Sequence, residues 1–192
     1  MKKGKIIIIS GPSGSGKTTL YKKLLSSQRF RGKLVKSISA TTRPKRFGEK
    51  HGRDYLFMSR KEFFDKKRSS HFLETQKVFD NYYGTPKKNV QALLKTGKNV
   101  LLCIDVKGAR VVSQKYSDAV KIFIKVGSLG ILKKRLKERG TETKTTLKLR
   151  LNIARRELLE EKKYRYVVVN NSLADAFREM TKIINAVIDC KT

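Results

Sequence analysis

The sequence predicts an α/β fold with a parallel sheet flanked by helices. Ile6 to Ile9 is an unbroken β-branched run, which is typical of a parallel strand buried on both faces. Similar apolar runs recur at residues 100–104, 120–126 and 166–169, with helix patterns between them. Strands that alternate with helices favour a parallel sheet built from crossover connections.

The helices are predicted from their ends and from their apolar spacing. One is expected between Thr85-Pro86 and Gly97, and another between Ser128 and Gly140. The last begins at a capping box and carries a single apolar stripe, typical of core packing. The stripe consists of Phe177, Met180, Ile184 and Val187, and the box of Ser172 and Asp175.

Two segments fit the alternation poorly. Residues 37–84 hold short alternating runs and one short helix capped by Ser59 and Glu62, while residues 137–150 are polar and dense in charge. Both are expected to be insertions at the rim of the sheet, where ligands bind in such folds.

The charge is strongly positive, with 46 Lys and Arg against 16 Asp and Glu, a net +30 over 192 residues. Such an excess attracts nucleic acid, anionic membranes or phosphorylated metabolites, and does not choose among them. The lysines are scattered along the chain, so a generally solvated basic surface is an alternative reading.

The two cysteines, Cys103 and Cys190, lie far apart and without metal-ligand spacing, which predicts a reduced, cytoplasmic protein. The apolar run at residues 6–9 is too short for a secretory leader, and no stretch is long enough to span a membrane.

A phosphate-binding loop directly follows the first strand and opens an apolar-spaced helix. Its glycines let backbone N–H groups converge on phosphate oxygens. Lys17 can reach the β and γ phosphates, and Thr18 can ligate Mg²⁺. A flexible glycine loop without a ligand is the alternative. The loop, with the next threonine, comprises Gly11, Pro12, Ser13, Gly14, Ser15, Gly16, Lys17, Thr18 and Thr19.

A P-loop indicates only that a nucleoside triphosphate binds. A chain of this length, without the switch region of a GTPase, favours a kinase of nucleotides or other small molecules. The acceptor is then expected on the first insertion.

Further motifs resemble those of the guanylate kinases. S-x-S-x-T-T-R begins at Ser37, G-E-x-x-G-x-D-Y at Gly48, N-Y-Y-G-T at Asn81 and I-D-x-x-G at Ile104, with Glu74 between them. The resemblance extends from Lys5 to about Ile188. It implies one domain over residues 1–192, with a core, a GMP-binding lobe and a small helical lid. The core is about 1–36, 86–130 and 153–192, the GMP-binding lobe about 37–85 and the lid about 131–152.

For the acceptor, the resemblance assigns cations and hydroxyls to the GMP phosphate, in the fork geometry that a phosphate favours. Carboxylates and hydroxyls are assigned to guanine, because its N1–H and N2–H₂ groups are donors. The phosphate set is Arg43, Arg46, Tyr55 and Tyr83. The set around the base is Ser39, Glu74, Thr85 and Asp105, and Gly84 is a further residue expected to bind GMP.

For the donor, the resemblance assigns the adenine of ATP to Asn170 and the closing lid to Arg135, Arg139 and Arg150. A solvated basic helix is the alternative for these arginines. The groups expected to act in phosphoryl transfer are Lys17, Arg43, Arg135, Arg139 and Arg150.

The implied reaction is Mg²⁺-dependent transfer from ATP to GMP, and to dGMP, in purine nucleotide metabolism. The chain is expected to work as a monomer or homodimer, with no membrane partner. Three rivals stay open. They are a non-catalytic phosphopeptide-binding module of guanylate-kinase-like fold, a kinase of phosphorylated sugars, and nonspecific polyanion binding from the +30 charge.

The chain departs from the family pattern in places. Cys103 stands where a carboxylate is usual, and Pro44 comes one place early, directly after Arg43. Arg165 and Asn171 also replace common acidic residues and are expected to be peripheral. Finally, Lys45, Lys50 and Arg53 are expected to be solvated bystanders.

Overall fold

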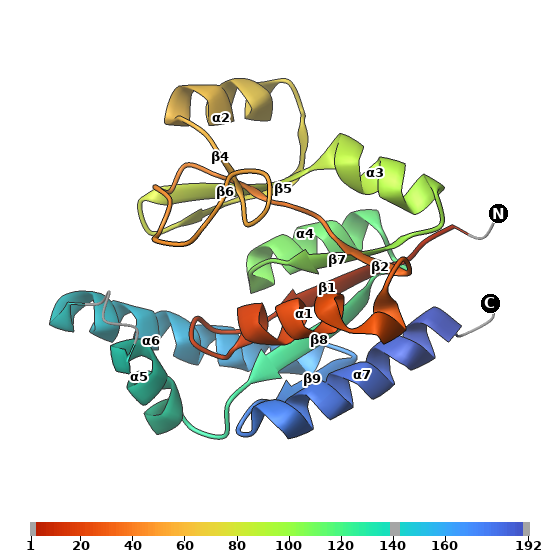
Figure 1. Cartoon of the computed structure of the whole chain (residues 1–192). Coiled ribbons are helices and arrows are strands. Elements are labelled where there is room, and N and C mark those ends of the chain that lie inside the picture. Colours follow the sequence, from red (N-terminus) through yellow and green to blue (C-terminus); the bar gives the residue numbers. More distant parts are fainter. Residues whose placement is uncertain (1–2, 139–142, 190–192) are drawn as a thin grey trace. The chain divides into compact units, whose positions relative to one another are not determined.

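The fold was analysed in a computed structural model, which describes residues 3–138 and 143–189. It confirms the α/β class, with a five-stranded sheet in the order β2-β7-β1-β8-β9 (Figure 1). Parallel pairings join β2 to β7, β1 to β8 and β8 to β9. The strands are β1 (Ile6–Ser10), β2 (Leu34–Lys36), β7 (Asn99–Cys103), β8 (Val120–Lys125) and β9 (Tyr166–Val169).

The strands predicted from apolar runs are all present, within a residue or two of the expected ends. All five residues of β1 are buried, as an unbroken apolar run requires when both faces of the sheet are covered. Ser10 at its end is buried too, and its hydroxyl donates to the carbonyl oxygen of Ile104 over 2.8 Å.

By its internal contacts, the chain divides into two compact units. The first comprises Met1–Ile6, Gly32–Leu102 and Lys107–Ala119, and the second Ile7–Arg31, Cys103–Val106 and Val120–Thr192. The boundaries of these two units differ from those of the core, the GMP-binding lobe and the lid expected from sequence. The expected boundaries therefore stay a prediction.

The first unit contains β2, β7 and a second sheet in the order β4-β3-β6-β5. That sheet is formed by β3 (Ala40–Thr41), β4 (Leu56–Phe57), β5 (Phe72–Val78) and β6 (Asn81–Pro86). The helices are α2 (Arg60–Arg68), α3 (Lys87–Lys95) and α4 (Val106–Lys115). As predicted, Ser59 caps α2, since its side chain accepts from the Glu62 backbone N–H at 3.1 Å.

An aromatic core holds α2 against its sheet. Phe63 is fully buried and stacks on Phe72 with 4.8 Å between ring centroids, and Phe64 meets Tyr82 edge to face. Gly84 must be a glycine at this contact, because a Cβ there would stand 2.9 Å from the Phe72 ring. Apolar packing therefore fixes the sheet that carries four of the nine expected acceptor residues, Glu74, Tyr83, Gly84 and Thr85.

The second unit contains β1, β8 and β9 with the helices that follow them. These are α1 (Lys17–Ser26), η1 (Gln28–Phe30), α5 (Leu129–Glu138), α6 (Lys144–Leu158), η2 (Leu159–Lys163) and α7 (Leu173–Asp189). The predicted cap of α7 is present, with the Asp175 N–H 3.4 Å from Ser172 Oγ. Of its stripe, Met180, Ile184 and Val187 are buried.

Helices α5 and α6 form the segment expected to be a lid. Leu132 and Leu136 of α5 and Ala154 of α6 are buried in one cluster with Val126, and Leu147 and Leu151 pack against it. This apolar seam explains why a charge-dense segment folds as helices. Gly140, expected to end the first of them, lies outside the described residues.

None of the described helices combines the length and the apolar character needed to cross a membrane.

Candidate active site

The predicted phosphate-binding loop lies between β1 and α1. Its first and last glycines are required by geometry. Gly11 has φ +137° and a Cβ there would stand 2.0 Å from the Ile124 carbonyl oxygen, while Gly16 has φ +88°. The loop therefore follows a backbone path that side chains would block, close against β8.

The Lys17 side chain folds back across the loop. Its Nζ donates to the carbonyl oxygens of Gly11 at 2.6 Å and Pro12 at 2.9 Å. Thr18 and Thr19 follow in the first turn of α1 and are exposed. An ammonium group and backbone N–H groups at one helix start are a suitable arrangement for a polyphosphate.

Asn170 lies beneath the loop. It is only 3% exposed, and its Nδ2 donates to the Ser15 carbonyl oxygen at 2.8 Å. A Cβ on Gly16 would stand 2.1 Å from that same nitrogen. Asn170, which the resemblance assigned to adenine, therefore holds the P-loop backbone through a hydrogen bond. The sequence did not predict this contact.

Two of the three expected lid arginines lie near the loop. Arg150 of α6 donates from Nη1 to Ser13 Oγ at 3.2 Å, and Arg135 of α5 donates from Nη2 to the Asn171 carbonyl oxygen at 3.4 Å. Asn171 also accepts from the Gly127 N–H at 2.7 Å, a structural bond that leaves the expectation of a position peripheral to the chemistry as a prediction. Arg139 lies outside the described residues.

The residues at the end of β7 belong to this second unit as well. Asp105 and Cys103 are both half-buried, and Cys103 forms no disulfide. The Ser10 hydroxyl lies 3.4 Å from the Asp105 carbonyl oxygen. Within residues 3–138 and 143–189, no three His, Cys, Asp or Glu side chains gather into a group that could hold a metal.

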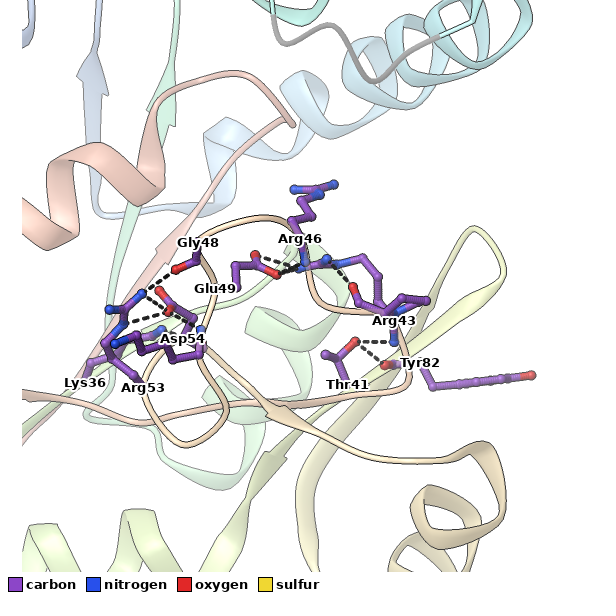
Figure 2. A network of polar contacts seen from close by, with 11 residues as sticks. Lys36, Thr41, Arg43, Arg46, Gly48, Glu49, Arg53, Asp54 and Tyr82 are labelled. Carbon is purple, nitrogen blue, oxygen red and sulfur yellow. Dashed lines mark hydrogen bonds and ion pairs between the residues drawn. The ribbon is translucent and has the colours of Figure 1, made fainter.

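In the first unit, Arg43 forms an ion pair with Glu49. Arg43 Nη2 donates to the two carboxylate oxygens at 2.8 and 2.9 Å, and Arg43 Nη1 donates to the Pro44 carbonyl oxygen at 2.7 Å (Figure 2). Burial alone would lower the pKa of Arg43, but the bonds to Glu49 and the nearby Tyr83 raise it above its usual value. Burial alone would raise the pKa of Glu49, but the bonds from Arg43 and from the Arg46 N–H hold this pKa below its usual range.

The two tyrosines expected at the GMP phosphate lie beside this arginine. The Tyr55 and Tyr83 rings meet edge to face, 6.1 Å apart, and the Arg43 guanidinium stands 5.5 Å from the Tyr55 centroid. Arg46 differs, since its side chain is exposed and only its backbone N–H bonds to Glu49, at 2.9 Å (Figure 2). The structure therefore brings Arg43, Tyr55 and Tyr83 together and leaves the Arg46 side chain pointing outward.

The loop that carries Arg43, Arg46 and Tyr55 is held by Asp54. Its carboxylate is buried and accepts from the Lys50 N–H at 3.0 Å and from Arg53 Nε at 2.8 Å. Arg53 Nη2 also donates to the Gly48 carbonyl oxygen at 2.7 Å, and Lys36 Nζ donates to the Asp54 carbonyl oxygen at 3.0 Å (Figure 2). Arg53 is more than half exposed, as expected of a solvated side chain, but it is not a bystander, because it closes the loop through an ion pair and a carbonyl bond.

Two of the groups expected around the base, Glu74 and Thr85, lie on the second sheet, as does Gly84. Glu74 of β5 is 7% exposed, and its Oε1 accepts from Thr85 Oγ1 of β6 at 2.6 Å. The neighbouring Gly84 pairs with both Thr75 and Ala40. Ser39 is half-buried directly before β3, and its carbonyl oxygen accepts from the Leu56 N–H at 2.9 Å. Asp105, the remaining member of this set, belongs to the other unit.

A P-loop at the end of a buried parallel strand, with two arginines beside it, defines a P-loop phosphotransferase. The model of the family "Guanylate kinase" matches residues 3–187. The guanylate kinase of Clostridium tetani is 46% identical over 186 residues, covering 97% of this chain and 88% of its own. That of Rickettsia felis is 41% identical over 184 residues, covering 96% and 94%.

Among solved structures, the crystal structure of guanylate kinase from Anaplasma phagocytophilum matches with a TM-score of 0.82 and 33% identity. The match covers 100% of this chain and 89% of that one. The chain belongs to the guanylate kinase family, whose members are ATP:GMP phosphotransferases.

Proposed function

We propose that this chain transfers the γ-phosphoryl group of ATP to GMP, and to dGMP, giving ADP and the nucleoside diphosphate. The observation that carries the acceptor is the buried carboxylate of Glu74, oriented by the 2.6 Å bond from Thr85. A buried acceptor at this point favours a base that presents donors, as guanine does with N1–H and N2–H₂. AMP lacks these two donors, and a mismatch of this kind at a site built to bond them can cost a factor on the order of 10⁴ in specificity.

The phosphate of GMP is proposed to bind at Arg43, Tyr55 and Tyr83, with Arg46 swinging in from its exposed position. In support, these three side chains already lie together, with ring and guanidinium centres about 6 Å apart. Arg43 must exchange part of its pairing with Glu49 for the phosphate. A guanidinium has five N–H donors, so it can hold a carboxylate on one edge and a phosphate on another.

The donor ATP is proposed to bind at the P-loop, with Lys17, Arg135 and Arg150 around its phosphates. Lys17 would give up its carbonyl bonds to Gly11 and Pro12 for phosphate oxygens. Arg150 would do the same with its bond to Ser13. These groups neutralise and align the triphosphate, which is most of what phosphoryl transfer asks of a protein.

A magnesium ion fits the residues present. Mg²⁺ usually takes one or two protein oxygens and completes its shell with water and substrate phosphates. The exposed hydroxyl of Thr18 in the first turn of α1 supplies such an oxygen, and no protein cage of acidic groups is needed. When bound, the ion would help to neutralise the charge of the ATP phosphates.

The acceptor needs no strong general base. A phosphate monoester has a second pKa of about 6, so the GMP phosphate is already ionised near neutral pH. The protein's part is then to hold the attacking oxygen, to shield charge and to keep water away. We propose a place in purine nucleotide metabolism and, since both substrates are cellular nucleotides, a cytoplasmic location.

A coupled assay of ADP release tests the proposal, with ATP, Mg²⁺ and each of GMP, dGMP, AMP, CMP and UMP. We expect turnover with GMP and dGMP and almost none with the others. The Glu74→Gln variant should lose most activity toward GMP, while Glu62→Gln on the exposed face of α2 should retain it. Activity on AMP equal to that on GMP would contradict the assignment of the base site.

The +30 charge supports a second, weaker proposal of nonspecific polyanion binding. Its affinity for RNA should fall steeply between 50 and 200 mM salt, on the order of tenfold or more. Kinase activity at saturating substrate should change far less over the same range. RNA binding that resists salt would indicate a specific RNA-binding site. It would overturn the proposal that the charge acts only through counterion release.

A further inference from the structure

Glu74 lies on an irregular part of its strand. The pairing of β5 with β6 runs regularly from Val78 to Thr75, which is opposite Gly84, and then shifts so that Phe72 is opposite Pro86. Two residues of β5, Leu73 and Glu74, therefore face the single residue Thr85. This is a β-bulge, a device that redirects a side chain and leaves one strand locally unpaired. The proposed guanine-reading carboxylate thus depends on a backbone kink that the sheet does not fully hold.

The kink is held from outside the sheet by Lys115. This lysine is the last residue of α4, and its Nζ donates to the Leu73 carbonyl oxygen at 2.7 Å. Strand β5 is at the edge of its sheet, so this carbonyl has no neighbouring strand on that side. A charged donor on a backbone acceptor forms a strong hydrogen bond.

A cavity of about 700 Å³ lies at the same place. Its walls include Leu73, Glu74, Val111, Lys115 and Tyr116, so the outer side of the bulge borders open space rather than close packing. Val111 and Tyr116 form part of this wall, and the Lys115 and Thr85 bonds hold residues 73–74 beside it. The long, flexible side chain of Lys115 can extend along the edge of this cavity and hold the Leu73 carbonyl oxygen with its terminal ammonium group.

We propose that Lys115 is a positioning residue for base selection. By holding the Leu73 carbonyl oxygen it fixes the bulge, and the bulge aims the Glu74 carboxylate at the N1–H and N2–H₂ donors of guanine. Lys115 makes no contact with the substrate and acts through Glu74. This inference rests on the proposed function, since it assumes that Glu74 reads the base.

The test compares Lys115→Met, which keeps the length of the side chain and removes the donor, with Lys95→Met. Lys95 is the matched control, because it is also the exposed last residue of a helix, α3. The measured quantity is kcat/KM with GMP and with IMP, which lacks the 2-amino group. We expect Lys115→Met to lower kcat/KM for GMP about tenfold and for IMP far less, so that the preference for GMP narrows. The KM for ATP should stay constant.

A second measurement separates this inference from the proposed function. Amide hydrogen exchange across residues 72–76 should quicken in Lys115→Met, stay as in the wild type in Lys95→Met, and be largely restored in Lys115→Arg. A wild-type protein that does not phosphorylate GMP would overturn the proposed function, and the exchange rates would still decide whether Lys115 holds the bulge. An active wild type with an unchanged GMP to IMP preference in Lys115→Met would overturn the role of Lys115.

Discussion

The Glu49 carboxylate binds Arg43 through both of its oxygens, and one of these oxygens also accepts the backbone N–H of Arg46. One acidic side chain therefore organises both arginines expected at the GMP phosphate. The pair is mostly shielded, with side-chain exposures of 12% for Arg43 and 19% for Glu49. Such a shielded, well-aligned ion pair contributes more to stability than an exposed surface pair does.

The first prediction concerns the loss of this carboxylate. Glu49→Ala should raise the KM for GMP about tenfold, because Arg43 loses the carboxylate whose two oxygens accept from its Nη2 and hold the guanidinium in place. The KM for ATP should not change, since Glu49 bonds to Arg43 and to the Arg46 N–H, which belong to the proposed GMP phosphate site. Steady-state kinetics with each substrate varied in turn check this, with Glu62→Ala on α2 as the control. An equal rise of both KM values would indicate general damage to the fold.

The second prediction is the pH dependence of the same pair. The pKa of Glu49 is lowered in the folded protein from its usual 4.5. Its ion pair therefore stabilises the fold above about pH 4.5, and this stabilisation is lost as pH falls through the folded-state pKa. The difference in unfolding free energy between wild type and Glu49→Gln should be constant from pH 7 to 6 and shrink below pH 4.5. Urea unfolding at a series of pH values measures it. A difference that grows toward low pH would contradict the assigned direction.

Much of the core could be predicted from sequence because its signals are local. The run of Ile6 to Ile9 is apolar at every position, and the glycines that follow need their unusual backbone angles for steric reasons. The capping hydroxyls of Ser59 and Ser172 act within three residues of themselves. Where a short stretch of chain determines the local structure, the sequence pattern is sufficient to predict it.

Helix α4 was not predicted, and its composition explains why. Gly108 near its start is unfavourable in a helix interior, and only Ala109 and Val112 mark a short apolar face. This glycine is buried, and burial is a tertiary feature with no local signal. The pairing of Arg53 with Asp54 and Gly48 was missed for a similar reason, because a row of basic residues does not reveal which one meets a carboxylate.

The third prediction concerns Asn170. Asn170→Ala should lower the free energy of unfolding by about 1 to 3 kcal/mol, since the buried Ser15 carbonyl oxygen loses its donor. It should also raise the KM for ATP through a looser P-loop. Chemical denaturation and donor kinetics test both effects, with Asn152→Ala on α6 as an exposed control. Unchanged stability with an altered preference between ATP and GTP would instead favour a role in adenine contact.

The fourth prediction concerns Cys103, which stands where the family usually has a carboxylate. Cys103→Asp should leave turnover intact or raise it, most clearly at low Mg²⁺, because the position is half-buried at the end of β7 and can expose an acid to solvent. Turnover across a Mg²⁺ titration measures this. A collapse of turnover with an unchanged circular dichroism spectrum would show that the thiol is specifically required.

The last prediction separates two arginines of α6. Arg150 bonds to Ser13 of the P-loop, whereas Arg155 is exposed and lies 3.5 Å from Asn152 Oδ1 within its own helix. Arg150→Ala should lower kcat by at least about tenfold, because an arginine that stabilises the transferring phosphoryl group acts mainly in the transition state. Arg155→Ala, which removes the same charge from the same helix, should change kcat less than twofold.

The pair of variants decides between local and general effects of charge. Equal losses would mean that α6 contributes only to the overall positive potential, and both losses would then weaken together as salt screens them. A loss confined to Arg150 and resistant to salt is the expected result, because a short contact at the phosphates is screened far less than a distant charge. Single-turnover measurements with bound ATP and GMP isolate the chemical step from product release and make the comparison direct.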